Sequence, residues 1–271
     1  MMKIGTHEFD LHHKTYLMGI LNITPDSFSD GGKWLTTDAA VHHVGEMIRD
    51  GADVIDIGGE STRPGHTQIA EEEEISRILP VLTKIKETYD IPVSVDTYKS
   101  RVAKAAIDAG ADLINDIWGL KYDADMAKVI AQAGVFCCLM HNRTDMRYGN
   151  FLRDMTADLK ETVQIAQKAG IRNDRILLDP GIGFAKTYEN NLEAIRNLDQ
   201  LHALGYPLLL GTSRKSVIGT ALDLPVTERV EGTLVTTVFA VLARCAFVRV
   251  HDVKENARAV RMAEEILYRR M

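Results

Sequence analysis

The stretch DGADVIDI, residues 50–57, places a glycine at the end of a helix-like segment and an apolar strand immediately after it. The same arrangement returns in AGADLIND, residues 109–116, and in AGVFCCLM, residues 133–140. Glycine suits the left-handed conformation that commonly ends a helix. The repeat therefore indicates a chain in which helices and strands alternate, each helix ending just before the next strand.

Apolar runs of strand length occur along the whole chain, and segments with helical periodicity separate them. We expect strands at residues 16–22, 54–58, 92–96, 113–116, 135–141, 176–179, 207–211 and 247–251. We expect helices at residues 38–49, 71–89, 100–109, 125–133, 152–169, 189–204, 228–243 and 253–269. Near-continuous apolar strands that alternate with helices are typical of a parallel sheet covered by helices.

Eight such units in 271 residues favour one α/β fold, a single closed (β/α)8 TIM barrel, over an open doubly wound sheet. The first strand is not followed by the glycine-rich fingerprint of dinucleotide-binding sheets, which supports the closed form. No linker or low-complexity tract interrupts the chain, so we expect a single domain over residues 1–271. Alternating apolar residues in segment 1–14 predict an N-terminal hairpin that closes the bottom of the barrel.

The composition excludes several functional classes. A formal net charge of -6 argues against sequence-independent nucleic-acid binding, which requires a broad basic surface. The N-terminus lacks the order of a signal peptide, and Asn22 breaks its apolar run, which argues against a membrane span. Three cysteines without metal or disulfide spacing are expected to be buried thiols in a reducing compartment. We therefore predict a cytoplasmic protein.

Polar side chains gather where the predicted strands end, at the face that carries the active site in barrels of this kind. We expect four carboxylates to converge on this mouth, namely Asp56, Asp96, Asp116 and Asp179. Carboxylates in one concave site repel each other unless cations, hydrogen-bond donors or a metal face them. Their convergence therefore predicts a binding site rather than four independent structural roles.

Other charged residues are interpreted as structural. Asp38, Asp252 and the acid run at residues 71–74 lie where helices are expected to begin, and there a carboxylate can cap the helix or meet its dipole. Four histidines have no ligand spacing and are expected at the surface: His12, His13, His42 and His43.

Basic residues follow the last two predicted strands. Arg249 and His251 flank Val250, so both side chains point to one face of an extended strand. Arg214 and Lys215 follow the seventh strand in the motif GTSRKS. Loops after strands seven and eight frequently bind phosphate in such barrels, so these residues predict a site for a small anion, most simply a phosphate ester. Arg214 is compatible with contact either to the anion or to the neighbouring helix.

Two loops and one asparagine complete the predicted site. The loops TPDSFSDGGKW, residues 24–34, and GESTRPGHTQ, residues 59–68, combine glycine and proline with hydroxyls and a cation. Long loops of this kind are commonly lids or binding loops. Asn22 and the nearby acids suit magnesium, a hard cation that binds partly through substrate phosphates.

Seven motifs in order over nearly the whole chain resemble those of the bacterial dihydropteroate synthase family: GILNITPDSFSDGG, DIGGESTRPG, SVDTYKS, INDIWG, LDPGIGF, GTSRKS and RVHD. The combination is specific, although GIGF or RVHD alone would not be. The resemblance implies a (β/α)8 barrel, usually homodimeric, that joins 7,8-dihydropterin-6-ylmethyl diphosphate to p-aminobenzoate. The products are 7,8-dihydropteroate and pyrophosphate, magnesium is required, and sulfonamides inhibit the reaction.

The resemblance also implies roles for particular residues. The pterin ring is expected deep in the barrel, held by Asp96, Asn115, Asp179 and Lys215. The metal contact is expected at Asn22, and the diphosphate at Arg249 and His251. Substrate contact or the p-aminobenzoate side is expected at Thr62, Arg63, Pro64, Ser216 and Phe28. The residues expected to act in catalysis are Asp96, Lys215, Arg249 and His251.

The resemblance has departures. Val217 stands in RKSVIG where the family more often has phenylalanine, on the p-aminobenzoate side. The loop after the fifth strand is variable in the family, and Arg143 within it receives no role. Three polar residues interrupt the apolar face of the helix at 228–243 without explanation: Glu231, Thr236 and Thr237.

Two alternatives remain open on the sequence. A methyltetrahydrofolate-binding domain of a corrinoid methyltransferase would share the ring-binding residues, but ESTRPG together with TSRKS is not expected there. A non-catalytic pterin-binding paralogue is a different class of protein. The retained set of polar residues at the mouth counts against it: Asn22, Asp96, Lys215, Arg249 and His251.

Overall fold

The computed structural model of the chain describes residues 1–23, 33–61 and 67–268. Within these residues, eight parallel strands form one sheet in the order β8-β7-β6-β5-β4-β3-β10-β9. They are β3 (Tyr16–Asn22), β4 (Val54–Gly58), β5 (Val93–Asp96), β6 (Leu113–Asp116), β7 (Phe136–Met140), β8 (Ile176–Asp179), β9 (Leu209–Leu210) and β10 (Phe247–Val250). A parallel bridge from Leu178 to Leu208 joins β8 to the residue before β9 and closes the ring. The predicted TIM barrel is confirmed.

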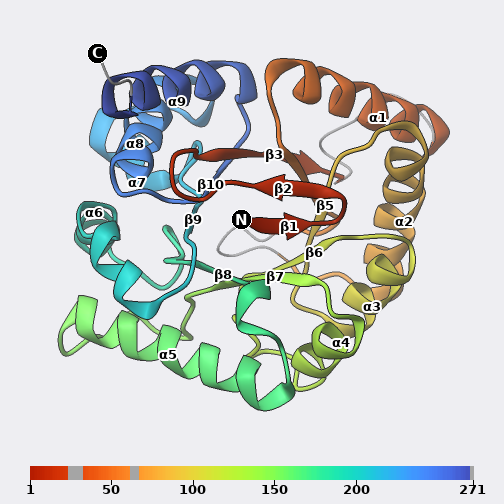
Figure 1. Ribbon diagram of the computed structural model, residues 1–271, viewed down its shortest axis with the longest axis horizontal. Coiled ribbons are helices and arrows are strands. Elements are labelled where there is room, and N and C mark those ends of the chain that lie inside the picture. The colour runs from red at the N-terminus through yellow and green to blue at the C-terminus, as the bar shows by residue number, and fades with distance from the viewer. Residues whose placement is uncertain (24–32, 62–66, 269–271) are drawn as a thin grey trace.

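Helices surround the barrel on its outside (Figure 1). They are α1 (Lys33–Asp50), α2 (Glu71–Thr88), α3 (Ser100–Asp108), α4 (Met126–Ala133), α5 (Phe151–Ala169), α6 (Tyr188–Arg196), α7 (Ser216–Leu222), α8 (Val230–Leu242) and α9 (Val253–Tyr268). The glycines of the sequence repeat, Gly51, Gly110 and Gly134, have φ of 107°, 101° and 66°. They end their helices in the left-handed region, as the repeat indicates.

Three helix predictions need correction. The single helix expected at 189–204 is divided into α6 and a 3-10 segment, Leu198–Leu204. The short helix α7 begins directly at Ser216 and was not predicted, because seven residues are too few to show helical periodicity. Helix α1 begins at Lys33, so Asp38 lies inside the helix and does not cap it.

The N-terminal hairpin closes the bottom of the barrel, as predicted. Strand β1 (Met2–Ile4) pairs antiparallel with β2 (His7–Phe9), and Figure 1 shows the hairpin across the centre of the ring. Its apolar side chains pack against residues that begin the barrel strands, among them Tyr16, Leu113 and Phe247. The rings of Phe9 and Tyr16 meet edge to face, with centroids 4.7 Å apart.

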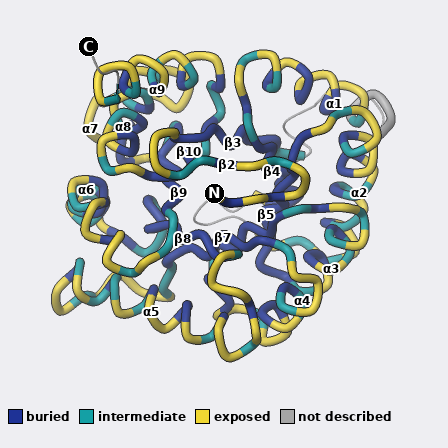
Figure 2. The backbone as a smooth tube through the Cα atoms, in the orientation of Figure 1, coloured by how far each residue is buried: buried dark blue, intermediate teal, exposed yellow. Residues whose placement is uncertain are grey.

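The barrel wall is buried on both faces, while the outer surfaces of the helices are exposed (Figure 2). The three cysteines, Cys137, Cys138 and Cys245, are buried free thiols, as expected. The four histidines expected at the surface are exposed. In the described parts of the chain, no helix combines the length and apolarity that crossing a membrane requires.

Candidate active site

An arginine between two carboxylates occupies the mouth of the barrel. Arg249 Nε on β10 donates to Asp56 Oδ2 on β4 at 2.5 Å, and Arg249 Nη2 donates to Asp96 Oδ2 at the end of β5 at 2.8 Å. Asp56 also accepts hydrogen bonds from Ser94 Oγ at 2.5 Å and from Asn115 Nδ2 at 3.2 Å. Parallel strands bring these side chains together because all strands end at the same face.

Asp96 retains an open acceptor. Its Oδ1 atom is buried and has no hydrogen-bond partner among the described residues. Burial raises the pKa of Asp96 to about 7, although the charge of Arg249 opposes the rise. Burial alone would lower the pKa of Arg249, but Asp56 and Asp96 outweigh that effect and raise it. A buried acceptor without a partner costs about 1–3 kcal/mol, so this oxygen favours a ligand that donates to it.

A second pair of opposite charges lies beside the first. Asp179, at the end of β8, accepts from Gly181 N at 2.7 Å, and Lys215 Nζ donates to Ile182 O at 2.5 Å. A Cβ atom at Gly211 would lie 3.6 Å from Asp179 Oδ2 and 3.8 Å from Lys215 Nζ. The absence of a side chain at Gly211 therefore leaves space beside both charges.

Burial perturbs both members of this pair. It lowers the pKa of Lys215 to about 8, with Asp179 opposing the change. It raises the pKa of Asp179, with Lys215 opposing. The ammonium of Lys215 also lies 4.9 Å from the ring centroid of Phe184, on the loop after β8. The pair thus presents an acceptor, a donor and an aromatic face in one place.

The other predicted site residues are placed as follows. His251 follows β10, and its Nδ1 lies 3.0 Å from Ser213 Oγ. Asn22 ends β3 opposite Gly58, where a Cβ would lie 3.5 Å from Asn22 Oδ1. Ser216 is exposed at the start of α7. Four predicted residues lie outside the described parts of the chain: Phe28, Thr62, Arg63 and Pro64.

Asp116 does not join the other carboxylates, and its predicted convergence on the mouth is wrong. Its carboxylate accepts from Trp118 N at 2.8 Å and from Leu120 N at 2.7 Å. Side chains alternate along a strand, so Asn115 faces the mouth and Asp116 faces away from it. Burial raises the pKa of Asp116 to about 6, while the two backbone N–H groups oppose the rise.

Arg214 contacts the neighbouring helix segment. Its guanidinium forms a two-point pair with Asp252, the residue before α9, so the Asp252 carboxylate holds this arginine. Arg214 N also donates to Thr233 Oγ1 at 3.1 Å, and Arg214 has a φ of 58°. This pairing directs Arg214 away from the Lys215 side of the turn.

Thr236 and Thr237 of α8 form hydrogen bonds to neighbouring elements, which explains why these positions are polar. Thr236 Oγ1 lies 2.7 Å from Thr212 Oγ1, at the turn that carries Lys215. Thr237 Oγ1 donates to Asn256 Oδ1 of α9 at 2.6 Å in a buried contact. They anchor the turn and α9, so their polarity is structural. Nothing in the structure explains Glu231.

One residue of the acid run at the start of α2 does more than interact with the helix dipole. Glu74 is buried, and its Oε2 accepts from Lys99 Nζ at 2.7 Å. The same ammonium donates to Glu60 Oε2 at 2.5 Å and to Ile69 O at 2.8 Å. Lys99 thereby ties together the start and the end of the loop at residues 59–68.

Sequence reasoning missed several groups near the mouth. Ser94 lies two residues before Asp96 on β5, so strand alternation was the signal that would have found it. Phe184 stands in the loop after β8, and Gly211 ends the segment that contains β9. Lys186 carried no pattern that separates it from a surface lysine, although it is buried.

The donor set at the mouth fits a metal held mainly by substrate. Among the residues of the three described ranges, no group of three or more His, Cys, Asp or Glu side chains is arranged to hold an ion. Asn22 offers one amide oxygen at the end of β3. Mg²⁺ usually keeps several waters and binds through one or two protein oxygens and a phosphate, so one such ligand suffices.

The barrel and its mouth are those of a pterin-binding enzyme, and the family of that name matches residues 18–251. Within this class the chain belongs to the dihydropteroate synthase family. It is 61% identical to the dihydropteroate synthase of Clostridium beijerinckii over 99% of this chain and 100% of that protein.

Two solved structures show the same fold. Dihydropteroate synthase of Clostridium difficile, determined in the presence of pteroic acid, is similar with a TM-score of 0.94 and 46% identity, over 97% of this chain and 100% of that one. Dihydropteroate synthase of Xanthomonas albilineans with 4-aminobenzoic acid has a TM-score of 0.91 and 38% identity, over 96% of this chain and 95% of that one.

Proposed function

We propose that the chain condenses 7,8-dihydropterin-6-ylmethyl diphosphate with p-aminobenzoate to give 7,8-dihydropteroate and pyrophosphate. The observation that carries the proposal is the set of ring-binding groups at the mouth. Asp96 Oδ1 is buried without a partner among the described residues, and the opposite charges of Asp179 and Lys215 border the space that Gly211 leaves. These groups match the alternating N–H donors and acceptors of a pterin ring. The names of the relatives support the same reaction.

The ring would be read by groups with fixed directions. Asp179 is an acceptor for the neighbouring N–H groups of the amino-pyrimidinone edge, and Lys215 is a donor to the acceptor atoms of the ring. Asn115 donates through Nδ2 to Asp56, which leaves its Oδ1 for a ring N–H. Asp96 Oδ1 receives another. The planar guanidinium of Arg249 can also stack on the ring.

The diphosphate needs positive charge beyond that of the described mouth. The carboxylates of Asp56, Asp96 and Asp179 outnumber the cations Arg249 and Lys215. Arg249 and His251 would face the diphosphate. Mg²⁺, bound through Asn22 and the diphosphate, would supply further charge to the leaving pyrophosphate. This balance accounts for a metal requirement in a site that has few protein ligands for a metal.

The chemistry asks little of the attacking amine. An aniline nitrogen is neutral at pH 7, so it attacks the methylene carbon without a general base. Loss of pyrophosphate is the harder step, and the electron-rich dihydropterin can stabilise a cationic methylene. The p-aminobenzoate side would be formed by Phe28, Arg63, Pro64 and Ser216, with Thr62 in contact with substrate. Exclusion of water there prevents hydrolysis of the cation.

The purified chain is expected to release pyrophosphate from the dihydropterin diphosphate only when both Mg²⁺ and p-aminobenzoate are present. Coupled detection of pyrophosphate, with chromatography of the dihydropteroate formed, measures the reaction. Chelation with EDTA should abolish product formation, and added Mg²⁺ should restore it. Methyl transfer from methyltetrahydrofolate to a cobalamin protein would instead support the corrinoid alternative, and pterin binding without turnover would support a non-catalytic paralogue.

We also propose that the chain forms a homodimer through the outer faces of α8 and α9. Val235, Phe239 and Leu242 lie at i, i+4 and i+7 on α8 and are 57%, 45% and 55% exposed. Met262 and Ile266 of the neighbouring α9 are exposed as well. A contiguous exposed apolar patch is commonly covered by a partner, and a second copy of this face is the occupant that the family resemblance implies.

The double variant Val235→Glu, Phe239→Glu is expected to be a monomer, because it buries two unpaired carboxylates in the proposed interface. Sedimentation velocity of wild type and variant at the same concentration measures the change. Gln132→Glu adds a charge to exposed α4 and should leave the dimer intact. A monomeric wild type, or a dimeric double variant, would contradict the proposed interface.

Three further assignments belong to this proposal. A single domain over residues 1–271 is consistent with one closed barrel through the described chain. A cytoplasmic location is supported by three buried thiols without a disulfide. Sulfonamides, which share the arylamine of p-aminobenzoate, are expected to compete at its site near Ser216, where the adjacent Val217 is buried in α7.

A further inference from the structure

Lys186 is a buried lysine whose ammonium has no ion pair with a carboxylate among the described residues. It lies in the loop after β8 and is 7% exposed. Its Nζ donates to Gly181 O at 2.9 Å, to Phe184 O at 3.0 Å and to His141 Nδ1 at 2.8 Å. An ammonium has three protons and no acceptor, so this set of three acceptors satisfies it completely.

These bonds hold the loop that forms one side of the mouth. Gly181 and Phe184 stand on either side of Ile182, whose carbonyl accepts from Lys215. The loop contains Ala185 with a φ of 45°, a conformation that a residue with a Cβ seldom adopts. A strained backbone of this kind persists only where several contacts enforce it. Lys186 supplies two of those contacts.

Further bonds hold the same loop from neighbouring elements. Tyr148 Oη donates to Ala185 O at 2.8 Å, and Gly183 N donates to Asn191 Oδ1 at 2.7 Å. Neither bond reaches the carbonyls of Gly181 and Phe184. Lys186 Nζ thus bonds both of these carbonyls, and it reinforces the backbone bond from Phe184 N to Gly181 O, 3.1 Å long.

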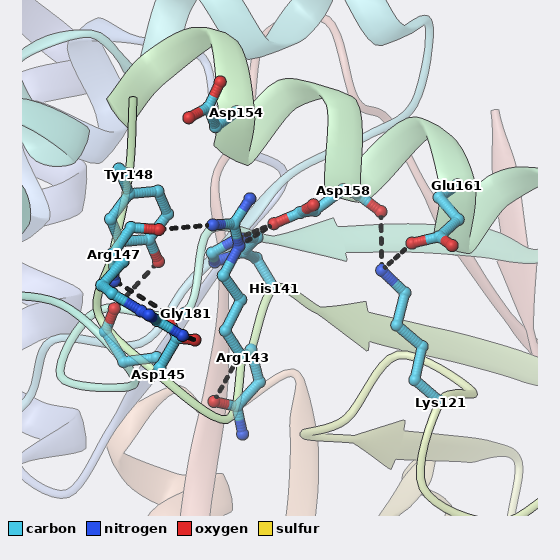
Figure 3. Close-up of polar contacts among 12 residues, drawn as sticks. Lys121, His141, Arg143, Asp145, Arg147, Tyr148, Asp154, Asp158, Glu161 and Gly181 are labelled. Carbon is cyan, nitrogen blue, oxygen red and sulfur yellow. Dashed lines mark hydrogen bonds and ion pairs between the residues drawn. The ribbon is translucent and has the colours of Figure 1, made fainter. Parts of the chain in front are cut away.

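A charged network fixes the third partner of Lys186. His141 Nε2 lies 2.9 Å from Asp158 Oδ2, and Arg143 Nε donates to the same oxygen at 2.5 Å (Figure 3). Because Lys186 donates to Nδ1, the proton of a neutral ring lies on Nε2 and points to Asp158. Burial lowers the pKa of His141 to about 4, in agreement with a neutral ring. Arg143, without a role on the sequence, thus anchors this network.

Burial of Lys186 is unfavourable by itself. It lowers the pKa of Lys186 to about 7, and the charge of Asp179 is the first to oppose that change. An apolar side chain would avoid the cost of burying a cation. All three hydrogen bonds of Lys186 nevertheless end on the loop after β8 or on His141, the residue that follows β7. The position of Lys186 is therefore understandable as support for the site.

We infer that Lys186 is a positioning residue for pterin recognition. It holds the loop after β8 so that Ile182 O and Phe184 stay in contact with Lys215, beside Asp179. The inference rests on the proposed function, because it names the part of the site that selects the pterin. Lys186 acts through the loop and not by touching the substrate. Loss of Lys186 is therefore expected to weaken the binding of the pterin substrate while the binding of p-aminobenzoate stays nearly unchanged.

Lys186→Met keeps the length of the side chain and removes its three donors. The KM for the dihydropterin diphosphate and the Kd for 6-hydroxymethylpterin, a fragment without phosphate, should rise by about tenfold to a hundredfold. The KM for p-aminobenzoate should stay within about twofold, well below the factor of ten that one lost hydrogen bond can cause. Steady-state kinetics and fluorescence titration give these values, and Lys160→Met, at an exposed lysine of α5, is the matched control.

A second pair of variants covers the case in which Lys186→Met does not fold. Asparagine at position 141 places an acceptor where Nδ1 stands, whereas leucine places none, so His141→Asn should bind 6-hydroxymethylpterin more tightly than His141→Leu. Wild-type pterin affinity in folded Lys186→Met, equal rises of both KM values, or equal affinity of the two His141 variants would overturn the inference. Failure of the proposed function would appear in the wild type, which would then form no product.

Discussion

Replacement of Lys215 by alanine is expected to raise the KM for the dihydropterin diphosphate and to lower kcat in the same enzyme. The ammonium of Lys215 is the described cation that opposes the burial-driven rise in the pKa of Asp179 most strongly. Its removal takes away both this charge and the donor to the ring, and a hydrogen bond from a charged group is worth about 1.5–3 kcal/mol. A loss of kcat/KM by roughly tenfold to a few hundredfold follows from that figure.

Steady-state kinetics with each substrate varied in turn separates this result from a general loss of structure. The KM for p-aminobenzoate should change much less than the KM for the pterin substrate, because Lys215 lies beside Asp179 and Gly211. Lys168→Ala removes an exposed lysine from α5 and serves as the control. Unchanged kinetics in Lys215→Ala would rule out the assignment of this residue to the ring.

Replacement of Arg249 by methionine is expected to destabilise the fold as well as abolish turnover. The guanidinium of Arg249 donates to both Asp56 and Asp96, so its loss leaves two buried carboxylates facing each other. Breaking a buried ion pair from one side costs about 3–5 kcal/mol in the free energy of unfolding. Urea unfolding of the variant and of wild type at pH 7 measures this difference.

The loss of stability in Arg249→Met should shrink as the pH falls. Burial already raises the pKa of Asp96 to about 7 against the opposing charge of Arg249, and removal of that charge raises it further. A carboxyl whose pKa is higher in the folded state destabilises the fold above that pKa, and protonation relieves the effect. The difference in unfolding free energy should therefore be smaller at pH 5 than at pH 8.

Two variants make the interpretation of Arg249→Met specific. Asp56→Asn combined with Arg249→Met removes one of the unpaired charges and should recover part of the stability without recovering activity. Arg196→Met removes an exposed arginine from α6 and should unfold like wild type. A difference between Arg249→Met and wild type that is the same at pH 5 and pH 8 would show that charge repulsion is not its cause.

Both variants act on one feature of the mouth, its balance of buried charge. Arg249 neutralises Asp56 and Asp96, and Lys215 faces Asp179, so each cation has a structural partner before any substrate binds. An incoming diphosphate therefore meets few uncommitted positive charges in the described mouth. This explains why the proposed reaction would depend on a metal carried with the substrate, while recognition of the ring depends on the protein.

The sequence by itself determined the barrel, because strand runs and helix-ending glycines are local patterns. Gly51, Gly110 and Gly134 marked helix ends correctly, and the strands lie where apolar runs predicted them. The ordered motifs identified the family, which the comparisons confirm. Most polar residues of the mouth were also found, because the end of each parallel strand is visible in the sequence. Their individual roles stay predictions.

Only the tertiary structure decided what each polar side chain contacts. Asp116 and Asn115 are neighbours in sequence but face opposite sides of β6, and Arg214 bonds to Asp252, a residue distant along the chain. Lys186 has no distinguishing pattern, and its partner His141 meets it only because the end of β7 and the loop after β8 lie side by side. The physical reason is that backbone geometry depends on local sequence, whereas burial and ion pairing depend on which segments the closed barrel brings together.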